Sequence, residues 1–188
     1  SNTSIQDAFN LCWKLASVLN KQAGEALLET YDTERAPVAK QVVTRANQSI
    51  SEFGPIFEAL GMTGGTDYEL IKSNMDARCG TDAKAEAQRD ALNKAIAFKR
   101  YEFDAHGIEM NQRYSSNAIV CDGQLEPVFK KDAVLHYQPT TWPGARLPHA
   151  WVFDLSGRKH STLDLAGGGT FALFTGLGGE TWATAANE

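Results

Sequence analysis

The apolar side chains of the first sixty residues recur at helical spacing, and this pattern constrains the fold of the 188-residue chain more than any other feature. Near the N-terminus the apolar stripe consists of Ile5, Phe9, Cys12, Ala16 and Leu19, and the polar residues off it include Gln6, Asn10, Lys14 and Ser17. We therefore expect an amphipathic helix that buries the stripe and exposes the polar face.

The start of this helix carries a capping signal. Thr3 followed three residues later by Gln6 fits a capping box, so the first turn is expected around Ser4, with Asp7 near its positive end. The unpaired N–H groups of a helix N-terminus suit an anionic group. An ordinary capped helix that binds nothing is the alternative interpretation of the same spacing.

Further helices are expected over much of the first hundred residues. Good helix formers fill residues 25–35, and Pro37 suits the first position of a new helix. From Ala39 this helix would carry a second apolar stripe, formed by Val43, Ala46, Ile50, Phe53, Phe57 and Leu60. Gly54-Pro55 should bend or break it near its end.

Two more segments complete this region. The glycine-rich residues 62–81 indicate a surface excursion between helices. Asp82 could cap a third helix over residues 83–103, with Leu92, Ile96 and Phe103 on its inner side.

After Gly107 the apolar residues form shorter runs at 118–121, 150–153 and 171–174, separated by turn signals. These runs are typical of strands. The sequence therefore predicts an α+β fold, with a mainly helical N-terminal part followed by a short β-containing segment.

Composition excludes several classes of protein. The net charge of −5 and the lack of a Lys or Arg run argue against a nucleic-acid partner or a polybasic membrane surface. With no signal peptide and no apolar run of roughly 18 residues, we expect a soluble, cytoplasmic protein without a membrane partner. The three cysteines are far apart, so we expect reduced thiols, with Cys12 buried as a small apolar residue.

Other possible sites receive weaker support. The four histidines (His106, His136, His149 and His160) lack metal-ligand spacing, so no metal site is predicted. Gly167-Gly168-Gly169 and Gly178-Gly179 lack the context of a phosphate loop and are interpreted as turns. Trp142 and Trp151 are interpreted as packing anchors, and no catalytic residue is assigned within the chain.

The run from Asn2 to Ala16 resembles the helix that closes the flavin site of the FAD-dependent aromatic hydroxylases. In that family a Gly-x-Gly-Met-Asn turn is followed by four variable residues and Asp-Ala-x-Asn-Leu-x-Trp-Lys-Leu-Ala, and every fixed position from Asn2 onward is present. The Tyr-x-x-Glu-Arg arrangement of Tyr31, Glu34 and Arg35 also resembles the family. For Glu34 and Arg35 we expect a local ion pair rather than contact with substrate.

The second half of the chain resembles the same family. Pro143 to Trp151, followed by Asp164-Leu165 and residues 171–176, is similar to the passage by which phenol and chlorophenol hydroxylases enter a thioredoxin-like C-terminal domain. Residues 114–119 resemble the stretch before it. The 2,4-dichlorophenol hydroxylase branch is the best single match.

The resemblance implies an FAD-dependent monooxygenase that ortho-hydroxylates phenols, with NAD(P)H and oxygen as co-substrates and a homodimeric assembly. It places Asn2 and Thr3 against the flavin as cofactor-binding residues. The chain would be a C-terminal fragment, with residues 1–105 from the FAD-binding domain, 106–149 connecting, and 150–188 beginning a thioredoxin-like domain. Such a fragment alone would bind no cofactor and be inactive. A non-catalytic helical scaffold or dimerisation module is the alternative.

Overall fold

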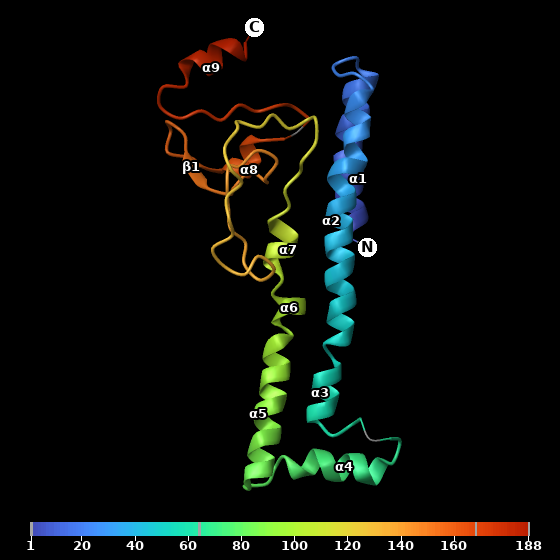
Figure 1. The fold of residues 1–188 in the computed structure, drawn as a ribbon. Coiled ribbons are helices and arrows are strands. Elements are labelled where there is room, and N and C mark those ends of the chain that lie inside the picture. Colours follow the sequence, from blue (N-terminus) through green and yellow to red (C-terminus); the bar gives the residue numbers. More distant parts are fainter. Residues whose placement is uncertain (1, 64, 168, 188) are drawn as a thin grey trace.

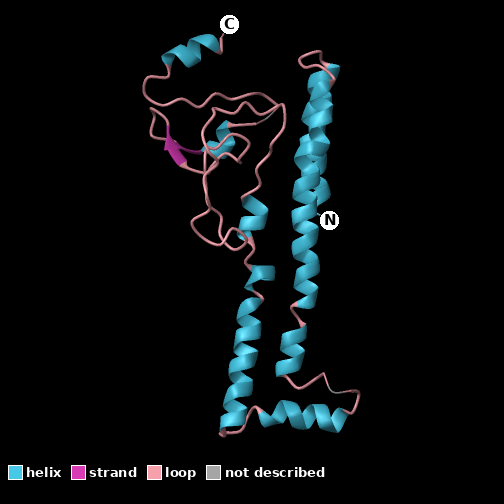
Figure 2. Ribbon diagram, viewed as in Figure 1, coloured by secondary structure: helices cyan, strands magenta, loops and turns pink. Residues whose placement is uncertain are grey.

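The computed structural model describes residues 2–63, 65–167 and 169–187, and about half of the chain is helical. Two long helical arms run side by side, and a transverse helix joins them at one end (Figure 1). The rest of the chain is mostly loop, with a short two-stranded sheet, and lies at the opposite end of the second arm (Figure 2). The coarse prediction of a mainly helical N-terminal part and a small β segment is therefore confirmed.

The first arm is built from α1 (Asn2–Leu19), α2 (Ala26–Ser51) and α3 (Gly54–Ala59). The predicted break at Gly54-Pro55 is confirmed, because Pro55 occupies the first turn of α3, where its missing N–H is not needed. The new helix expected at Pro37 is wrong, since Pro37 lies inside α2. Buried residues on both sides of it, Arg35 and Val38, hold the helix continuous.

The transverse helix and the second arm follow. The expected excursion over residues 62–81 contains α4 (Tyr68–Ala77), whose first turn is capped by Asp67 Oδ1. The cap at Asp82 is confirmed, because its Oδ1 accepts a hydrogen bond from the Ala85 amide at 2.7 Å. The helix expected over 83–103 is divided into α5 (Ala83–Phe98) and α6 (Arg100–Phe103). α3 packs on α5.

The second half begins with α7 (His106–Met110) and ends with α9 (Glu180–Ala185). Between them, β1 (Trp151–Phe153) pairs antiparallel with β2 (Lys159–Ser161), and α8 (Thr162–Leu165) follows directly. The predicted strand at 150–153 is confirmed. Those at 118–121 and 171–174 are wrong, because these segments are loop, with Val120 and Phe171 about nine-tenths exposed and no strand beside them.

The packing of α1 reverses the expectation from the sequence. Ile5, Phe9 and Leu19 are between 70% and 79% exposed, and Cys12 is exposed as well. The buried residues of α1 are Asn10 and Lys14, from the polar face. The expectation that the stripe is buried is therefore wrong. The polar face is buried instead because α2 presents polar groups to α1, and charged groups leave water only where matching partners replace it.

The second arm departs from the sequence prediction in the same way. Of the three residues expected on its inner side, Leu92 is half-buried, whereas Ile96 and Phe103 are 53% and 75% exposed. Small residues fill that side instead, since Ala85 and Ala95 are the buried positions of α5. Apolar faces therefore point outward along both arms.

The second half is fixed internally by a close backbone contact between residues 113–114 and 144–145. The Tyr114 amide donates to the Gly144 carbonyl at 2.9 Å, and Arg113 pairs with Ala145 as an isolated bridge. Gly144 has a φ of +84°, and a Cβ there would lie 2.0 Å from the Tyr114 carbonyl oxygen. This position therefore requires glycine.

We predict that Gly144→Ala destabilises the chain by about 2–4 kcal/mol, combining the left-handed backbone penalty with the clash at Tyr114. Gly123→Ala is the matched control, because Gly123 has a φ of +79° with open space around the new Cβ, and it should cost only about 1 kcal/mol. Urea unfolding measures both. Equal losses in the two variants would contradict the close contact.

Candidate functional site: two buried ion pairs behind the start of α1

A buried carboxylate joins three segments that are distant in sequence. Glu34 on α2 accepts hydrogen bonds from Lys14 Nζ at 2.7 Å and from Asn10 Nδ2 at 2.8 Å, both on Oε2. Its Oε1 accepts a bond from Ser116 Oγ at 2.7 Å. Lys14 also donates to Thr30 Oγ1 at 2.7 Å. One carboxylate thus holds α1, α2 and the segment around residue 116 together.

Hydrogen bonds keep the buried carboxylate of this cluster ionised. Lys14 is fully buried and Glu34 is 4% exposed. Burial alone would raise the pKa of Glu34, but hydrogen bonds from Lys14, Asn10 and Ser116 outweigh it and lower the pKa below its ordinary value of 4.5. The ionised pair therefore contributes stability above about pH 4.5, and this contribution is lost as the pH falls through the lowered pKa.

The neighbouring Arg35 makes a second junction. Its Nε donates to Asp7 Oδ1 at 2.7 Å, its Nη1 to the Tyr114 hydroxyl at 2.9 Å, and its Nη2 to Gln6 Oε1 at 3.2 Å. Burial would lower the pKa of Arg35, but the bonds to Asp7 and Tyr114 raise it above its usual value. The guanidinium, 3% exposed, connects the first two turns of α1 to residue 114.

The local ion pair expected between Glu34 and Arg35 is wrong. Consecutive helical residues point about 100° apart and do not face each other. Each side chain instead finds its own partner on α1, Glu34 with Lys14 and Arg35 with Asp7.

The two residues predicted to bind the cofactor, Asn2 and Thr3, form the first turn of α1. The helix begins at Asn2, so the capping box expected between Thr3 and Gln6, with a start at Ser4, is wrong; Gln6 faces Arg35 instead. The first turn carries no acidic residue, and the first carboxylate along α1, Asp7, is paired with Arg35. This helix start is therefore electropositive and fits an electron-rich, partly anionic ring.

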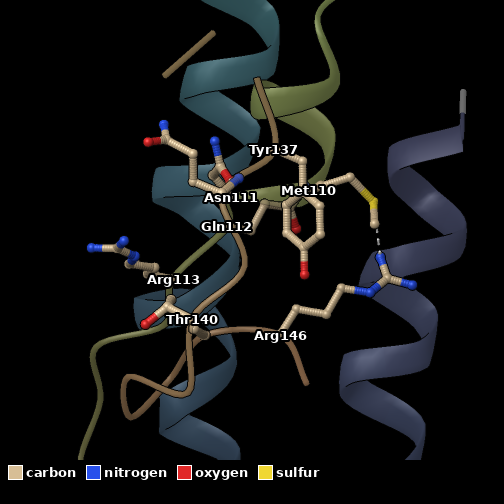
Figure 3. A pocket seen from close by; sticks show the side chains of 9 residues that line it. Met110, Asn111, Gln112, Arg113, Tyr137, Thr140 and Arg146 are labelled. Atoms are coloured by element: carbon tan, nitrogen blue, oxygen red, sulfur yellow. Dashed lines mark hydrogen bonds between the residues drawn. The ribbon is translucent and has the colours of Figure 1, made fainter. Parts of the chain in front are cut away.

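An open pocket of about 490 Å³ adjoins the first turns of α1. Its apolar wall includes Ile5, Phe9 and Met110, and its polar groups include Arg146, Tyr114 and Glu109. A cavity of about 10 Å³ lies next to it, where Arg146 Nη1 approaches Met110 Sδ at 3.6 Å beside Tyr137 (Figure 3). The apolar face of α1 and residues 144–146 thus meet at one concave surface.

Two of the four histidines that were predicted to lack metal-ligand roles make side-chain contacts within the second half of the chain. His149 Nδ1 contacts Ser161 Oγ at 2.8 Å, and His160 Nε2 contacts Asp154 Oδ2 at 3.0 Å. Hydrogen bonds from Ser156 and His160 hold the pKa of Asp154 well below its usual range. Within residues 2–63, 65–167 and 169–187, no group of three or more His, Cys, Asp or Glu side chains could hold a metal ion.

The tryptophans and glycine runs also lie in the second half. Trp142 is half-buried, whereas Trp151 is 55% exposed on β1, so only the former has the burial of a packing anchor. Gly167, Gly169 and Gly178 have positive φ angles suited to turns, and Gly168 lies outside the described residues. In the described part of the chain, no helix combines the length and the apolar composition needed to cross a membrane.

Sequence reasoning missed the network that organises the site. Lys14, Asn10 and Ser116 were assigned no partner, although a signal was present: Asp7, Asn10 and Lys14 recur at intervals of three and four on one face of α1, and Thr30 and Glu34 do so on α2. Charged and polar residues at matching helical spacing on two neighbouring helices indicate that the two polar faces pack against each other.

The chain is similar to known flavin-dependent proteins. The family described as FAD binding domain matches residues 1–46. The chain is 52% identical over 186 residues to phenol 2-monooxygenase from Pseudomonas sp. (strain EST1001), and 53% identical over 187 residues to 2,4-dichlorophenol 6-monooxygenase from Cupriavidus pinatubonensis. Each alignment covers 99% of this chain, which spans about 30% of the relatives' length.

A solved structure shares the arrangement. The flavin-dependent monooxygenase PieE, in complex with FAD and substrate, superposes with a TM-score of 0.91 at 44% identity, over 99% of this chain and 32% of PieE. RebC, a rebeccamycin biosynthetic enzyme with reduced flavin, gives a TM-score of 0.62 at 30% identity, over 98% of this chain and 30% of RebC.

The network predicts a specific loss of stability. Ser116→Ala removes one charge-assisted hydrogen bond to Glu34 and should cost about 1.5–3 kcal/mol. Ser115→Ala, at the exposed neighbouring position, should change stability by less than about 0.5 kcal/mol. Denaturant unfolding of both variants measures the difference, and equal stabilities would show that Ser116 does not serve the buried carboxylate.

Proposed function

We propose that this chain, which corresponds over nearly its whole length to about a third of the FAD-dependent phenol monooxygenases, is part of an enzyme that hydroxylates a phenol next to its hydroxyl group. NAD(P)H and oxygen are the co-substrates of the proposed reaction. Phenols, including chlorophenols, are the proposed substrate class because the two relatives named above act on them.

One observation carries the proposal beyond overall identity. The residues that resemble the hydroxylase family lie far apart in the sequence, in 2–16, 31–35, 114–119 and 143–151. The buried contacts bring the first three segments together through Glu34 and Arg35, and Gly144 joins the fourth to Tyr114. Four segments that resemble one enzyme family and contact each other in the folded chain support a shared role in that enzyme.

The proposed cofactor contact lies at the start of α1. We assign the backbone N–H groups of Asn2 and Thr3 to the edge of the flavin ring, where negative charge gathers on reduction. When bound, FAD supplies the redox chemistry. The described residues hold the helix start in place, pair the carboxylate of Asp7 with Arg35 and present the N–H groups of the first turn.

The finer architecture belongs to the same proposal. Residues 1–105 would complete an FAD-binding domain, 106–149 would connect, and 150–188 would begin a thioredoxin-like domain, for which β1 and β2 provide a first hairpin. We also propose that the enzyme is cytoplasmic and forms a homodimer.

A helical scaffold or dimerisation module is the second candidate, and a specific observation favours it. Val43, Ile50 and Phe57 on the first arm are between 44% and 73% exposed. A continuous apolar face of this kind is typical of a surface that contacts another protein or another part of the same protein.

The proposed activity is tested in the full-length protein that carries this chain. We expect it to purify with bound FAD and to oxidise NAD(P)H faster when a phenol is added, with oxygen uptake and a catechol product. This chain purified alone should be colourless. Full-length protein without flavin, or without a phenol-dependent increase in NAD(P)H oxidation, would refute the proposal.

The proposed self-association is tested with the chain itself. Analytical ultracentrifugation should show a mass that rises with concentration, and the double variant Val43→Lys/Ile50→Lys should be a folded monomer because it adds charge to the exposed face. Leu125→Lys/Val128→Lys is the control, since both positions are almost fully exposed in a loop that belongs to neither apolar stripe. A concentration-independent monomer for the unmodified chain would exclude the module.

A further inference from the structure

The first two turns of α1 depend on few side-chain contacts. Among the described residues, the side chains of these turns receive hydrogen bonds from Arg35, through Asp7 and Gln6, and from Gln112, at 3.5 Å to Gln6 Oε1. The apolar residues of the same turns, Ile5 and Phe9, face outward. Arg35 is therefore the main side-chain anchor of the end of α1 that carries Asn2 and Thr3.

The anchor is geometrically specific. A guanidinium presents its N–H groups in a rigid planar fork, and here three nitrogens serve three different acceptors. Two acceptors lie on α1 and the third is the Tyr114 hydroxyl. The tilt of the α1 start is thereby fixed against both α2 and residue 114.

Rigid backbone supports the third acceptor. Tyr114 is hydrogen-bonded to Gly144 through its amide, and the approach at Gly144 is too close for any side chain. A connected path of contacts thus runs from Gly144 through Tyr114 and Arg35 to Asp7. Because the Tyr114 hydroxyl is held in place, the Arg35 guanidinium can reach its three acceptors in one orientation.

Arg35 also neutralises the charge of the Asp7 carboxylate. Asp7 is 29% exposed at its side chain and lies in the second turn of α1, where its carboxylate would oppose the positive end of the helix if it were unpaired. The ion pair with Arg35 at 2.7 Å neutralises it. The start of α1 therefore keeps its affinity for negative charge.

We propose that Arg35 is a positioning residue for the flavin, acting through Asp7 and Gln6 and touching no cofactor atom itself. The proposal rests on the proposed contact between the start of α1 and FAD. Arg35 holds the first-turn N–H groups in place and neutralises Asp7, the acidic residue that follows them in α1, so it favours the reduced, more negative flavin.

The test uses the full-length flavoprotein and three variants, of which two change Arg35 alone and one changes both Arg35 and its ion-pair partner Asp7. Arg35→Gln should weaken FAD binding about tenfold and shift the flavin reduction potential to a more negative value, because Asp7 is left unpaired. Arg35→Lys keeps the charge without the fork, so affinity should fall while the potential stays near that of the parent. Arg35→Gln/Asp7→Asn should restore the potential but not the affinity.

Arg100→Gln is the matched control, because Arg100 forms an exposed ion pair with Asp104 at 3.1 Å on α6. It should leave both affinity and potential unchanged. If Arg35→Gln unfolds the protein, Tyr114→Phe, which removes one of the three acceptors, should still weaken FAD binding measurably.

Parent-like affinity and potential in the folded Arg35 variants, with only a lower melting temperature, would overturn the proposal by showing a purely structural role. If Tyr114→Phe is used in their place, FAD binding equal to that of the parent would overturn it as well. Full-length parent protein that binds no FAD would instead refute the proposed function, so the two failures are distinguishable.

Discussion

The ion pair between Lys14 and Glu34 is the constraint on which the arrangement of the first arm depends. Both charges are almost completely withdrawn from water, and a buried ion pair is tolerated only when its geometry is good and its remaining hydrogen-bonding groups are satisfied. Thr30, Asn10 and Ser116 supply those partners. The pair thus fixes the register of α1 against α2 and attaches residue 116, from the second half of the chain, to both.

The polar interface has a direct consequence for the surface of the molecule. Because α1 turns its charged face toward α2, its apolar face with Ile5 and Phe9 points outward, and the pocket beside Met110 and Arg146 forms against that face. The same helix start that is electropositive is therefore flanked by an apolar surface. A flavin, whose ring is largely apolar and whose pyrimidine edge gathers charge on reduction, combines the two properties that such a site would recognise.

The sequence predicted the similarity to FAD-dependent monooxygenases, the helical first half, the break at Gly54-Pro55, the cap at Asp82 and the strand at 150–153. It failed where tertiary partners override local pattern. An apolar stripe implies burial only if an apolar partner exists, and here Glu34 made the polar face the buried one. Pro37 was assigned to a helix start because nothing local shows that α2 continues through it. The cofactor assignment of Asn2 and Thr3 remains a prediction, whereas the junction at Arg35 could be seen only once residues 7, 35 and 114 were brought together.

A double-mutant cycle on Lys14 and Glu34 tests most directly whether this buried pair organises the arm. Lys14→Met and Glu34→Gln each leave one partner buried without its counterpart and should lose about 3–5 kcal/mol in the free energy of unfolding. The double variant should recover part of this loss, giving a coupling energy of about 2–3 kcal/mol. Losses that add within about 0.5 kcal/mol would contradict the account, because they would mean that the two charges do not depend on each other in the folded chain.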